Sequence, residues 1–480
     1  MAKILKLSSV FLAFFFFYFL GTAHASAAGY AYKGIAFYAF ENNSATGTLP
    51  VYKFYSASRG DYSYTISESA KAKLIADPKK IYAYKGIAFY TYNNNSVANT
   101  LPVYQFWSSS RQDYYYTISE STKAKLIADP KKLYAYKGIA FYAYNDNSIA
   151  NTLPVYQFWN ASIQDYYYTI SEDEKDKLMF ATYGKEISVG LWSYSKNDLS
   201  SDAFQIEANK DYEIKDNTGK VLAKIAGNSL TKVKYAGNYK LRIYNSISDI
   251  LVDREVQFES SDGNNLNLIF NVHRPNSTYD EYRGKIKLRY SDTSQKIWVI
   301  NLLPLEQYVW GIGEITGTGD EDYNRTMTTA FRTYAYWKIL YSTKYATEGF
   351  KVDGTPNNQI YRGYEWELAY PRIKDAAIYT QGKIAKYGSD IALSPYSSWT
   401  DGRTRSFEER WGSTDYPWCQ SVKDSYGKNP TMTTSQLFAA GNHMVGISAH
   451  GALKLATDYG WDWNKILGYY LHDITIVKTY

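Results

Sequence analysis

Glu314 is the carboxylate of this 480-residue chain whose sequence neighbours best suit proton transfer. Trp310, Ile312 and Ile315 flank it and offer apolar contact. Apolar surroundings disfavour the charged form of a carboxyl group and raise its pKa toward the pH at which an enzyme works. These surroundings suit a general acid/base at Glu314. The alternative interpretation is a loop carboxylate close to the start of a helix.

Glu306 is the rival carboxylate in the same segment. Its expected task is to orient the loop that carries Glu314 or to pair with Arg332. If both carboxylates faced one cleft, a hydrolase of the two-carboxylate type would become possible.

Several predicted elements lead to and follow these glutamates. A β-rich stretch is expected over residues 186–272, and strands are expected at 285–290 and 297–303. A helix is predicted at about 322–341, because apolar residues recur there at helical spacing. The residues of this expected buried stripe are Met327, Ala330, Phe331, Tyr334 and Tyr341.

Three tandem repeats precede this region. The segment that begins at Tyr30 returns at Tyr82 and again at Tyr134, which gives a period of 52 residues. Each copy contains runs rich in branched and aromatic residues, which are typical of strands. One copy has too few apolar positions to bury a face alone, so the three copies are predicted to share a core with pseudo-threefold symmetry. A β-trefoil-like unit is expected.

An aspartate followed by a tyrosine recurs at the same place in each repeat. A carboxylate acceptor beside a ring is a combination that suits glycan binding. The alternative is that these tyrosines are core and turn residues. The predicted repeat site residues are Asp61, Tyr62, Asp113, Tyr114, Asp165 and Tyr166.

The N-terminus and the composition favour a secreted protein. Residues 1–25 combine lysines, an apolar run and a small-x-small cleavage pattern, which predicts a signal peptide. No later segment is long and apolar enough to be transmembrane. The single cysteine, Cys419, allows no intramolecular disulfide. The net charge of +6 is spread without a long basic run, which argues against a nucleic-acid partner and suits an anionic cell wall.

Six segments of the C-terminal half follow one another at residues 305–308, 311–314, 331–335, 358–363, 397–404 and 443–452. In their sequences and in this order they resemble the stage II sporulation protein D family. The repeats resemble, over residues 30–182, a bacterial repeat of uncharacterised function that occurs on secreted and wall-associated proteins.

The resemblance implies a peptidoglycan lytic transglycosylase. Such an enzyme cleaves the bond between N-acetylmuramic acid and N-acetylglucosamine and leaves a 1,6-anhydro sugar. It implies Glu314 as the acid/base. Some members of the family carry a zinc site of Cys and His near a Ser-rich loop, but that loop contains neither residue here, so no metal is expected, and no cofactor is expected either. The residues expected to bind substrate or to support the site are Glu306, Tyr308, Arg332, Tyr334, Gln359, Tyr361, Ser398, Thr400, Arg403, Thr404, His443 and Ser448.

Two alternatives stay open. Within the same family, the chain can be an amidase enhancer that binds the wall and a wall amidase; Asp401, where the family pattern has a glycine, keeps this alternative open. From another class, the whole chain can be a wall glycan-binding or adhesion protein.

The predicted fold class is α+β, with an all-β repeat unit before a mixed α+β domain. The expected boundaries are a signal peptide at 1–25, repeats at 26–182, a β-rich part at 183–280 and a catalytic domain at 281–480.

Overall fold

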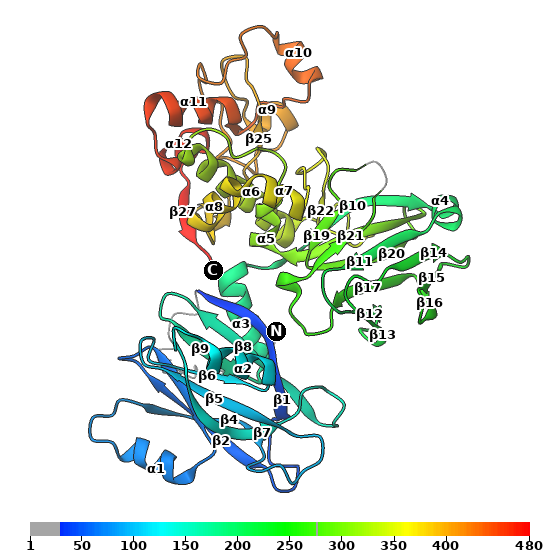
Figure 1. The fold of residues 1–480 in the computed structure, drawn as a ribbon. Helices are drawn as coiled ribbons and strands as arrows, with labels where there is room; N and C mark the ends of the chain where they lie inside the picture. Colours follow the sequence, from blue (N-terminus) through cyan, green and yellow to red (C-terminus); the bar gives the residue numbers. More distant parts are fainter. Residues whose placement is uncertain (1–28, 275–276) are drawn as a thin grey trace, which may run out of the picture.

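The computed structural model describes residues 29–274 and 277–480. The predicted signal peptide, residues 1–25, lies outside the described residues. Figure 1 shows the repeats, coloured blue to cyan, below a green β-rich part and a helix-rich part in yellow to red. No helix among the described residues has both the length and the apolar character needed to cross a membrane. The α+β class is confirmed.

Every repeat folds into three strands and one helix. A serine caps each helix, because the hydroxyls of Ser67, Ser119 and Ser171 accept backbone N–H groups three residues later. The elements are β1 (Tyr30–Phe40), β2 (Leu49–Ser56), β3 (Asp61–Thr65), α1 (Glu68–Ala76), β4 (Ala83–Thr91), β5 (Leu101–Ser108), β6 (Asp113–Thr117), α2 (Glu120–Ala128), β7 (Ala135–Ala143), β8 (Thr152–Asn160), β9 (Asp165–Thr169) and α3 (Glu172–Tyr183).

The repeats join into a nearly closed, barrel-like arrangement. The first strand of each later repeat pairs with the second strand of the repeat before it, as β4 does with β2 and β7 with β5. β1 pairs with β8 of the last repeat and so connects the two ends. The shared core predicted from the sequence is present, but the β-trefoil prediction is not confirmed.

Aromatic triads occupy the centre of the repeat unit. Phe37, Phe89 and Phe141 meet edge to face with ring centroids 5.6–5.9 Å apart. The hydroxyl of Tyr116 donates to the carbonyl of Tyr64 at 3.0 Å and accepts the N–H of Tyr64 at 3.2 Å. The same two bonds join Tyr168 to Tyr116 and Tyr64 to Tyr168. These cyclic bonds satisfy buried backbone groups.

The repeat aspartates lie inside this unit. Asp61, Asp113 and Asp165 are buried, and each accepts a tyrosine hydroxyl, from Tyr82, Tyr134 and Tyr30 respectively. The backbone N–H groups of two of the paired tyrosines, Tyr62 and Tyr166, donate to Asp165 and Asp113 at 3.0 Å. The surface glycan pockets predicted around Asp61, Tyr62, Asp113, Tyr114, Asp165 and Tyr166 are therefore not formed, because the acceptor oxygens face the interior.

Burial raises the pKa of all three aspartates. The pKa rises to about 7 for Asp61, about 6 for Asp113 and about 9 for Asp165. Their oxygens come within 4.8 Å of one another, so adjacent negative charges add to the effect for Asp61 and Asp165.

We predict that the repeat unit loses stability as pH rises. A carboxyl group whose pKa is raised in the folded state contributes stability below its unfolded pKa, near 3.8, and this contribution is lost as pH rises through about 6 to 9. Asp165→Asn should reduce this pH dependence and protect the unit at pH 8 more than at pH 5. Hydrogen exchange of the β9 amides in the full chain, at both pH values, measures the stability of the unit.

The exposed Asp173→Asn on α3 is the matched control and should retain the wild-type pH dependence. If the stability of Asp165→Asn fell with rising pH as steeply as that of the wild type, titration of the buried Asp165 would not be the cause of the pH dependence.

Two sheets form the β-rich part. One has the order β13-β12-β17-β20-β21-β10-β22 and the other β16-β15-β14-β11-β18-β19. Strands from both sides of residue 280 share each sheet, so the expected boundary at 280/281 falls within this part. The elements are β10 (Glu186–Ser195), α4 (Lys196–Ser201), β11 (Phe204–Ala208), β12 (Tyr212–Asp216), β13 (Val221–Ile225), β14 (Thr231–Tyr235), β15 (Lys240–Tyr244), β16 (Asp249–Asp253), β17 (Glu255–Ser260), β18 (Ile269–Asn271), β19 (Glu281–Arg283), β20 (Lys285–Ser291), β21 (Lys296–Pro304) and β22 (Val352–Asp353).

The helix-rich part surrounds α6, and the predicted helix is confirmed there. Tyr341 is 54% exposed, so it does not belong to the buried stripe that Met327, Ala330 and Phe331 form. The elements are α5 (Leu305–Trp310), α6 (Glu321–Tyr341), α7 (Tyr364–Ala369), α8 (Pro371–Tyr379), β23 (Lys383–Tyr387), β24 (Asp390–Ile391), β25 (Tyr396–Ser397), α9 (Phe407–Trp411), α10 (Thr434–Ala439), β26 (Ile447–Ser448), α11 (Ala449–Tyr459), α12 (Trp463–Tyr470) and β27 (Thr475–Lys478).

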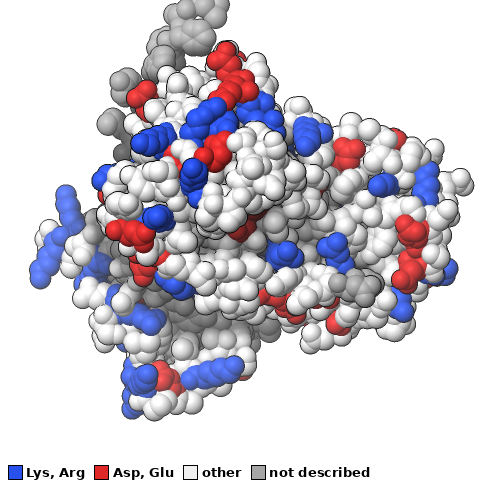
Figure 2. All heavy atoms as spheres, turned by 90° about the horizontal axis from the view of Figure 1, so that it is seen from above, with Lys and Arg blue, Asp and Glu red and all other residues white. Residues whose placement is uncertain are grey.

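The surface of this part carries both signs of charge. Figure 2 shows basic and acidic side chains interspersed on the face seen from above. This mixture agrees with the spread of charge in the sequence.

Candidate active site

A cavity of about 700 Å³ opens in the helix-rich part. Its wall combines side chains of α6 and α9 with the loops around residues 356–360, 393–398 and 440–443. Among the described residues that line it, Glu314 is the only carboxylic acid. The polar and aromatic residues of the lining are Glu314, Tyr334, Lys338, Lys344, Asn357, Asn358, Tyr396, Ser397, Ser398, Phe407, Trp411, Asn442 and His443.

Glu314 lies in the turn after α5 and is held against a second loop. Ile312 bridges to Tyr361, and the N–H of Gly313 donates to the carbonyl of Ile360 at 2.8 Å. In return, the N–H of Ile360 donates to Glu314 Oε1 at 2.7 Å. A Cβ at Gly313 would lie 2.7 Å from Arg362 Cγ, so this close approach requires glycine.

Burial raises the pKa of Glu314, and the hydrogen bonds from Ile360 and Tyr396 oppose this rise in part. The direction agrees with the sequence prediction, but the cavity around the carboxylate also includes Met327 and Ile360. Trp310 lies instead beside Lys374, whose Nζ is 4.5 Å from the ring. A carboxyl group whose pKa is raised by burial is better suited to donate a proton than an ordinary solvent-exposed carboxyl group.

A chain of polar side chains supports Glu314 from behind. The hydroxyl of Tyr308 donates to Gln359 Oε1 at 3.1 Å, and Gln359 Nε2 donates to the hydroxyl of Tyr396 at 3.3 Å. The Tyr396 hydroxyl is hydrogen-bonded to Glu314. Tyr308 and Gln359 are buried and do not line the cavity, so their hydrogen bonds reach it only by way of Tyr396.

His443 lies at the cavity wall in its neutral form. Burial lowers its pKa to about 4, and the positive charge of Arg410 adds to this effect. Its Nδ1 accepts the N–H of Val445 at 3.0 Å, so Nε2 carries the proton. The Trp411 ring lies 5.0 Å from the His443 ring. Tyr334 and Ser398 also line the cavity, and Tyr334 Oη accepts from Asn358 Nδ2 at 3.3 Å.

Glu306 does not reach the cavity. It forms a buried bidentate pair with Arg332, with both N···O distances at 2.8 Å. Glu306 Oε1 also accepts the N–H of Gly382 at 2.9 Å and the hydroxyl of Tyr480 at 2.8 Å. Arg332 donates to the carbonyl of Ala377 at 2.8 Å. The pairing expected from the sequence is present, and none of the described residues that line the cavity places a second carboxylate opposite Glu314.

The other predicted site residues are placed away from the cavity. Tyr361 is buried and donates to Asn301, and Thr400 is buried against Asp424. Arg403 pairs with Glu409, Thr404 accepts the N–H of Val422, and Ser448 caps α11. These five residues hold loops and helix ends in this structure.

The sequence reasoning missed several residues of the cavity. Tyr396, which bonds Glu314, stands directly before the segment 397–404 that carries part of the family resemblance. Lys338 follows Tyr334 by one helical turn on α6, a spacing that places both on one helix face. Trp411 and Asn442 come from segments without a recognisable pattern and meet only through the fold.

No metal or cofactor was expected from the sequence. Among the described residues, the repeat aspartates are the acidic cluster whose oxygens are close enough to hold a cation, and this cluster lies outside the cavity.

Comparison with known families agrees with both halves of the chain. The family described as "Stage II sporulation protein" matches residues 293–387, which contain Glu306, Glu314 and Arg332. The family described as "Domain of unknown function (DUF5648)" matches residues 21–129 and 80–194, which cover the repeats. Part of the C-terminal half is therefore similar to the stage II sporulation protein family, and the N-terminal part is similar to a domain of unknown function.

One relative is Stage II sporulation protein D of Bacillus subtilis (strain 168). The two chains are 28% identical over 196 residues, which are 37% of this chain and 57% of the relative. The match thus spans little more than half of the relative's length.

We predict that Arg332→Met strongly destabilises the helix-rich part. Removing one partner leaves the buried Glu306 carboxylate uncompensated, which typically costs about 3–5 kcal/mol. Urea unfolding of the full chain measures the loss. Arg242→Met is the control, because its pair with Asp249 is more than half exposed and should contribute little to stability. Equal effects of both changes would contradict the central role of the buried pair.

Proposed function

We propose that the C-terminal part is a peptidoglycan lytic transglycosylase with Glu314 as its single acid/base. The observation that carries the proposal is one half-buried carboxyl group with a raised pKa in a cavity with no other carboxylic acid among its described lining residues. The stage II sporulation protein domain supports the choice of peptidoglycan as substrate. The predicted signal peptide supports an extracellular or wall-associated location.

The chemistry requires one carboxyl group. Protonated Glu314 gives its proton to the glycosidic oxygen as the bond from C1 of N-acetylmuramic acid breaks. The C6 hydroxyl of the same sugar then attacks C1, and the Glu314 carboxylate removes its proton. The nucleophile is internal, so its effective concentration is high and no second carboxylate has to activate water. The product ends in a 1,6-anhydro ring.

The remaining lining residues suit a glycan. Ser398, Asn358 and Asn442 offer neutral donors and acceptors, and Trp411 and Tyr334 offer rings for the apolar faces of sugars. Lys338 and Lys344 add positive charge to the same wall, which suits the carboxylates of peptidoglycan.

A two-carboxylate hydrolase is less well supported. Such enzymes place two carboxyl groups on either side of the scissile bond. Here Glu306 is bound to Arg332 inside the protein. The amidase enhancer remains the second candidate, because Asp401 stands where the family pattern has a glycine and forms an ion pair with Arg405.

We predict that Glu314→Gln abolishes the formation of anhydro-muropeptides and leaves the fold intact. Gln keeps the shape of the side chain but cannot exchange a proton, and the loss should be about 10²–10⁴-fold or larger. Mass spectrometry of digested peptidoglycan detects the products. Glu408→Gln is the matched control, because Glu408 is exposed on α9 beside the cavity residue Phe407.

A well-folded Glu314→Gln variant with an unchanged rate would remove Glu314 from the acid/base role. A wild-type protein without any cleavage would favour the enhancer.

We predict that Tyr396→Phe shifts the pH profile of kcat/KM. The Tyr396 hydrogen bond lowers the pKa of Glu314, so its loss should raise that pKa and move the alkaline limb to higher pH. The rate below this limb should fall less than in Glu314→Gln. An unchanged profile would show that Tyr396 only packs against α6, where its ring lies 4.9 Å from Phe331.

A further inference from the structure

The three repeats share one surface feature that only the first of them buries. The sequence Tyr-Lys-Gly-Ile occurs at residues 32–35, 84–87 and 136–139. Tyr32 is 4% exposed, whereas Tyr84 and Tyr136 are each 40% exposed. Ile87 and Ile139 are 45% and 47% exposed.

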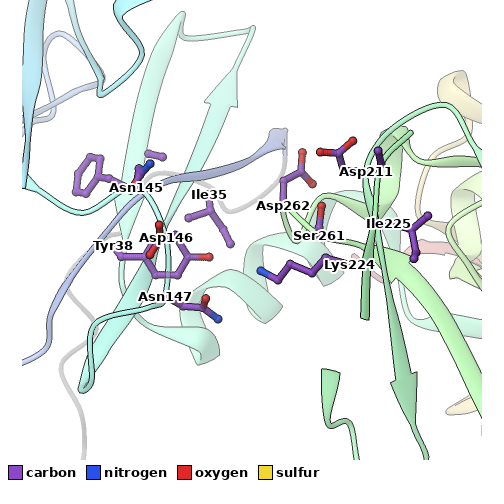
Figure 3. Close-up of a pocket in the computed structure, with 13 residues that line it drawn as sticks. Ile35, Tyr38, Asn145, Asp146, Asn147, Asp211, Lys224, Ile225, Ser261 and Asp262 are labelled. Carbon is purple, nitrogen blue, oxygen red and sulfur yellow. The ribbon is translucent and has the colours of Figure 1, made fainter. Parts of the chain in front are cut away.

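The β-rich part covers the first copy. A Cβ at Gly263 would lie 3.2 Å from Ile35 Cδ1 and 3.4 Å from the Tyr32 hydroxyl, and Leu266 joins the core around Tyr32. Figure 3 shows Ile35 and Tyr38 facing Ser261 and Asp262 across a cavity of about 440 Å³. In repeats 2 and 3 none of the described residues covers the same surface in this way.

The two open copies have the same construction. The Tyr84 ring packs on Phe54 with centroids 5.3 Å apart, and the Tyr136 ring packs on Phe106 at the same distance. Each exposed ring is therefore held in place from one side by the preceding repeat. The exposed part of each ring, in the described part of the chain, can receive a ligand.

Polar groups surround each exposed ring in the same way. Lys71 Nζ lies 3.9 Å from the centre of the Tyr52 ring and 5.7 Å from that of Tyr84. Glu68 pairs with Lys71 at 3.2 Å and accepts the Tyr52 hydroxyl.

The second copy repeats this arrangement. Lys123 Nζ lies 4.2 Å and 5.8 Å from the ring centres of Tyr104 and Tyr136, and Glu120 takes the place of Glu68.

We infer that Tyr84 and Tyr136 are the centres of two equivalent glycan-binding sites. A pyranose ring has an apolar C–H face bordered by hydroxyl groups, and each site offers a fixed tyrosine ring bordered by an ammonium donor and a carboxylate acceptor. The identification of this glycan as the wall polysaccharide rests on the proposed function.

The size and number of the sites favour a glycan over a protein. A stable protein interface buries about 800 Å² on each partner, which is far more than one tyrosine and one isoleucine provide. Two copies of one small site suit a polymer that repeats the same sugar. Simultaneous engagement of both copies raises the apparent affinity without a new contact.

Binding of the full chain to insoluble peptidoglycan stripped of teichoic acid tests the assignment. The reference protein, called the parent, carries Glu314→Gln, so that the glycan strands are not cleaved during the measurement. All binding variants are made in this parent. The double variant Tyr84→Ala/Tyr136→Ala should bind at least about tenfold more weakly, because both stacking rings and their avidity are lost. Each single variant should show an intermediate loss.

Tyr341→Ala is the matched control, because Tyr341 is an exposed tyrosine of the helix-rich part. It should bind like the parent. Thermal unfolding checks that the repeat variants remain folded.

Equal binding of parent and double variant would overturn the inference, and so would a parent that does not bind. Loss of binding after protease treatment of the peptidoglycan would identify a protein ligand and would also overturn it. The cleavage assay with the wild-type chain is separate, so a failure of the proposed enzyme activity is distinguishable from a failure of these sites.

Discussion

The buried pair of Glu306 and Arg332 is the interaction on which the helix-rich part depends. It connects α5 with α6, and through Gly382, Ala377 and Tyr480 it also connects these helices with α8 and the segments around β23 and β27. Glu314 lies in the turn that follows α5, so the position of the cavity carboxylate relies on the same charges. The two neighbouring glutamates thus have opposite environments. Glu306 is buried and paired with Arg332, whereas Glu314 faces a cavity and has no ion pair with a Lys or Arg of the described residues.

The core of the repeat unit contains many tyrosines. The hydroxyls of Tyr64, Tyr116 and Tyr168 would be costly inside an apolar core without partners. They bind each other's backbone in a cycle, while the aspartates accept the hydroxyls of a second set of tyrosines. The abundance of tyrosine therefore serves packing and hydrogen bonding at once, and only a minority of the rings remains at the surface.

Local patterns predicted much of the fold. The period of 52 residues, the strands before Glu306 and the helix after Glu314 follow from spacing within short windows. The glycan pockets at the repeat aspartates were wrong, because an Asp-Tyr pair looks the same in a sequence whether it faces water or a symmetry axis. Tyr396 was missed for a related reason. Its contact with Glu314 joins segments about 80 residues apart, and the spacing of residues within a short window does not reveal a contact between distant segments.

The pairing of β1 with β8 fixes the number of copies in the repeat unit. In an open solenoid a copy can be gained or lost at an end, because each repeat contacts only its neighbours. Here the first strand of the first copy completes the last one, with Tyr30 opposite Asn160. A two-copy or four-copy version would have to change the curvature of every strand pair. The unit is therefore expected to form in a single cooperative step, whose slowest part is bringing the two ends of the chain segment together.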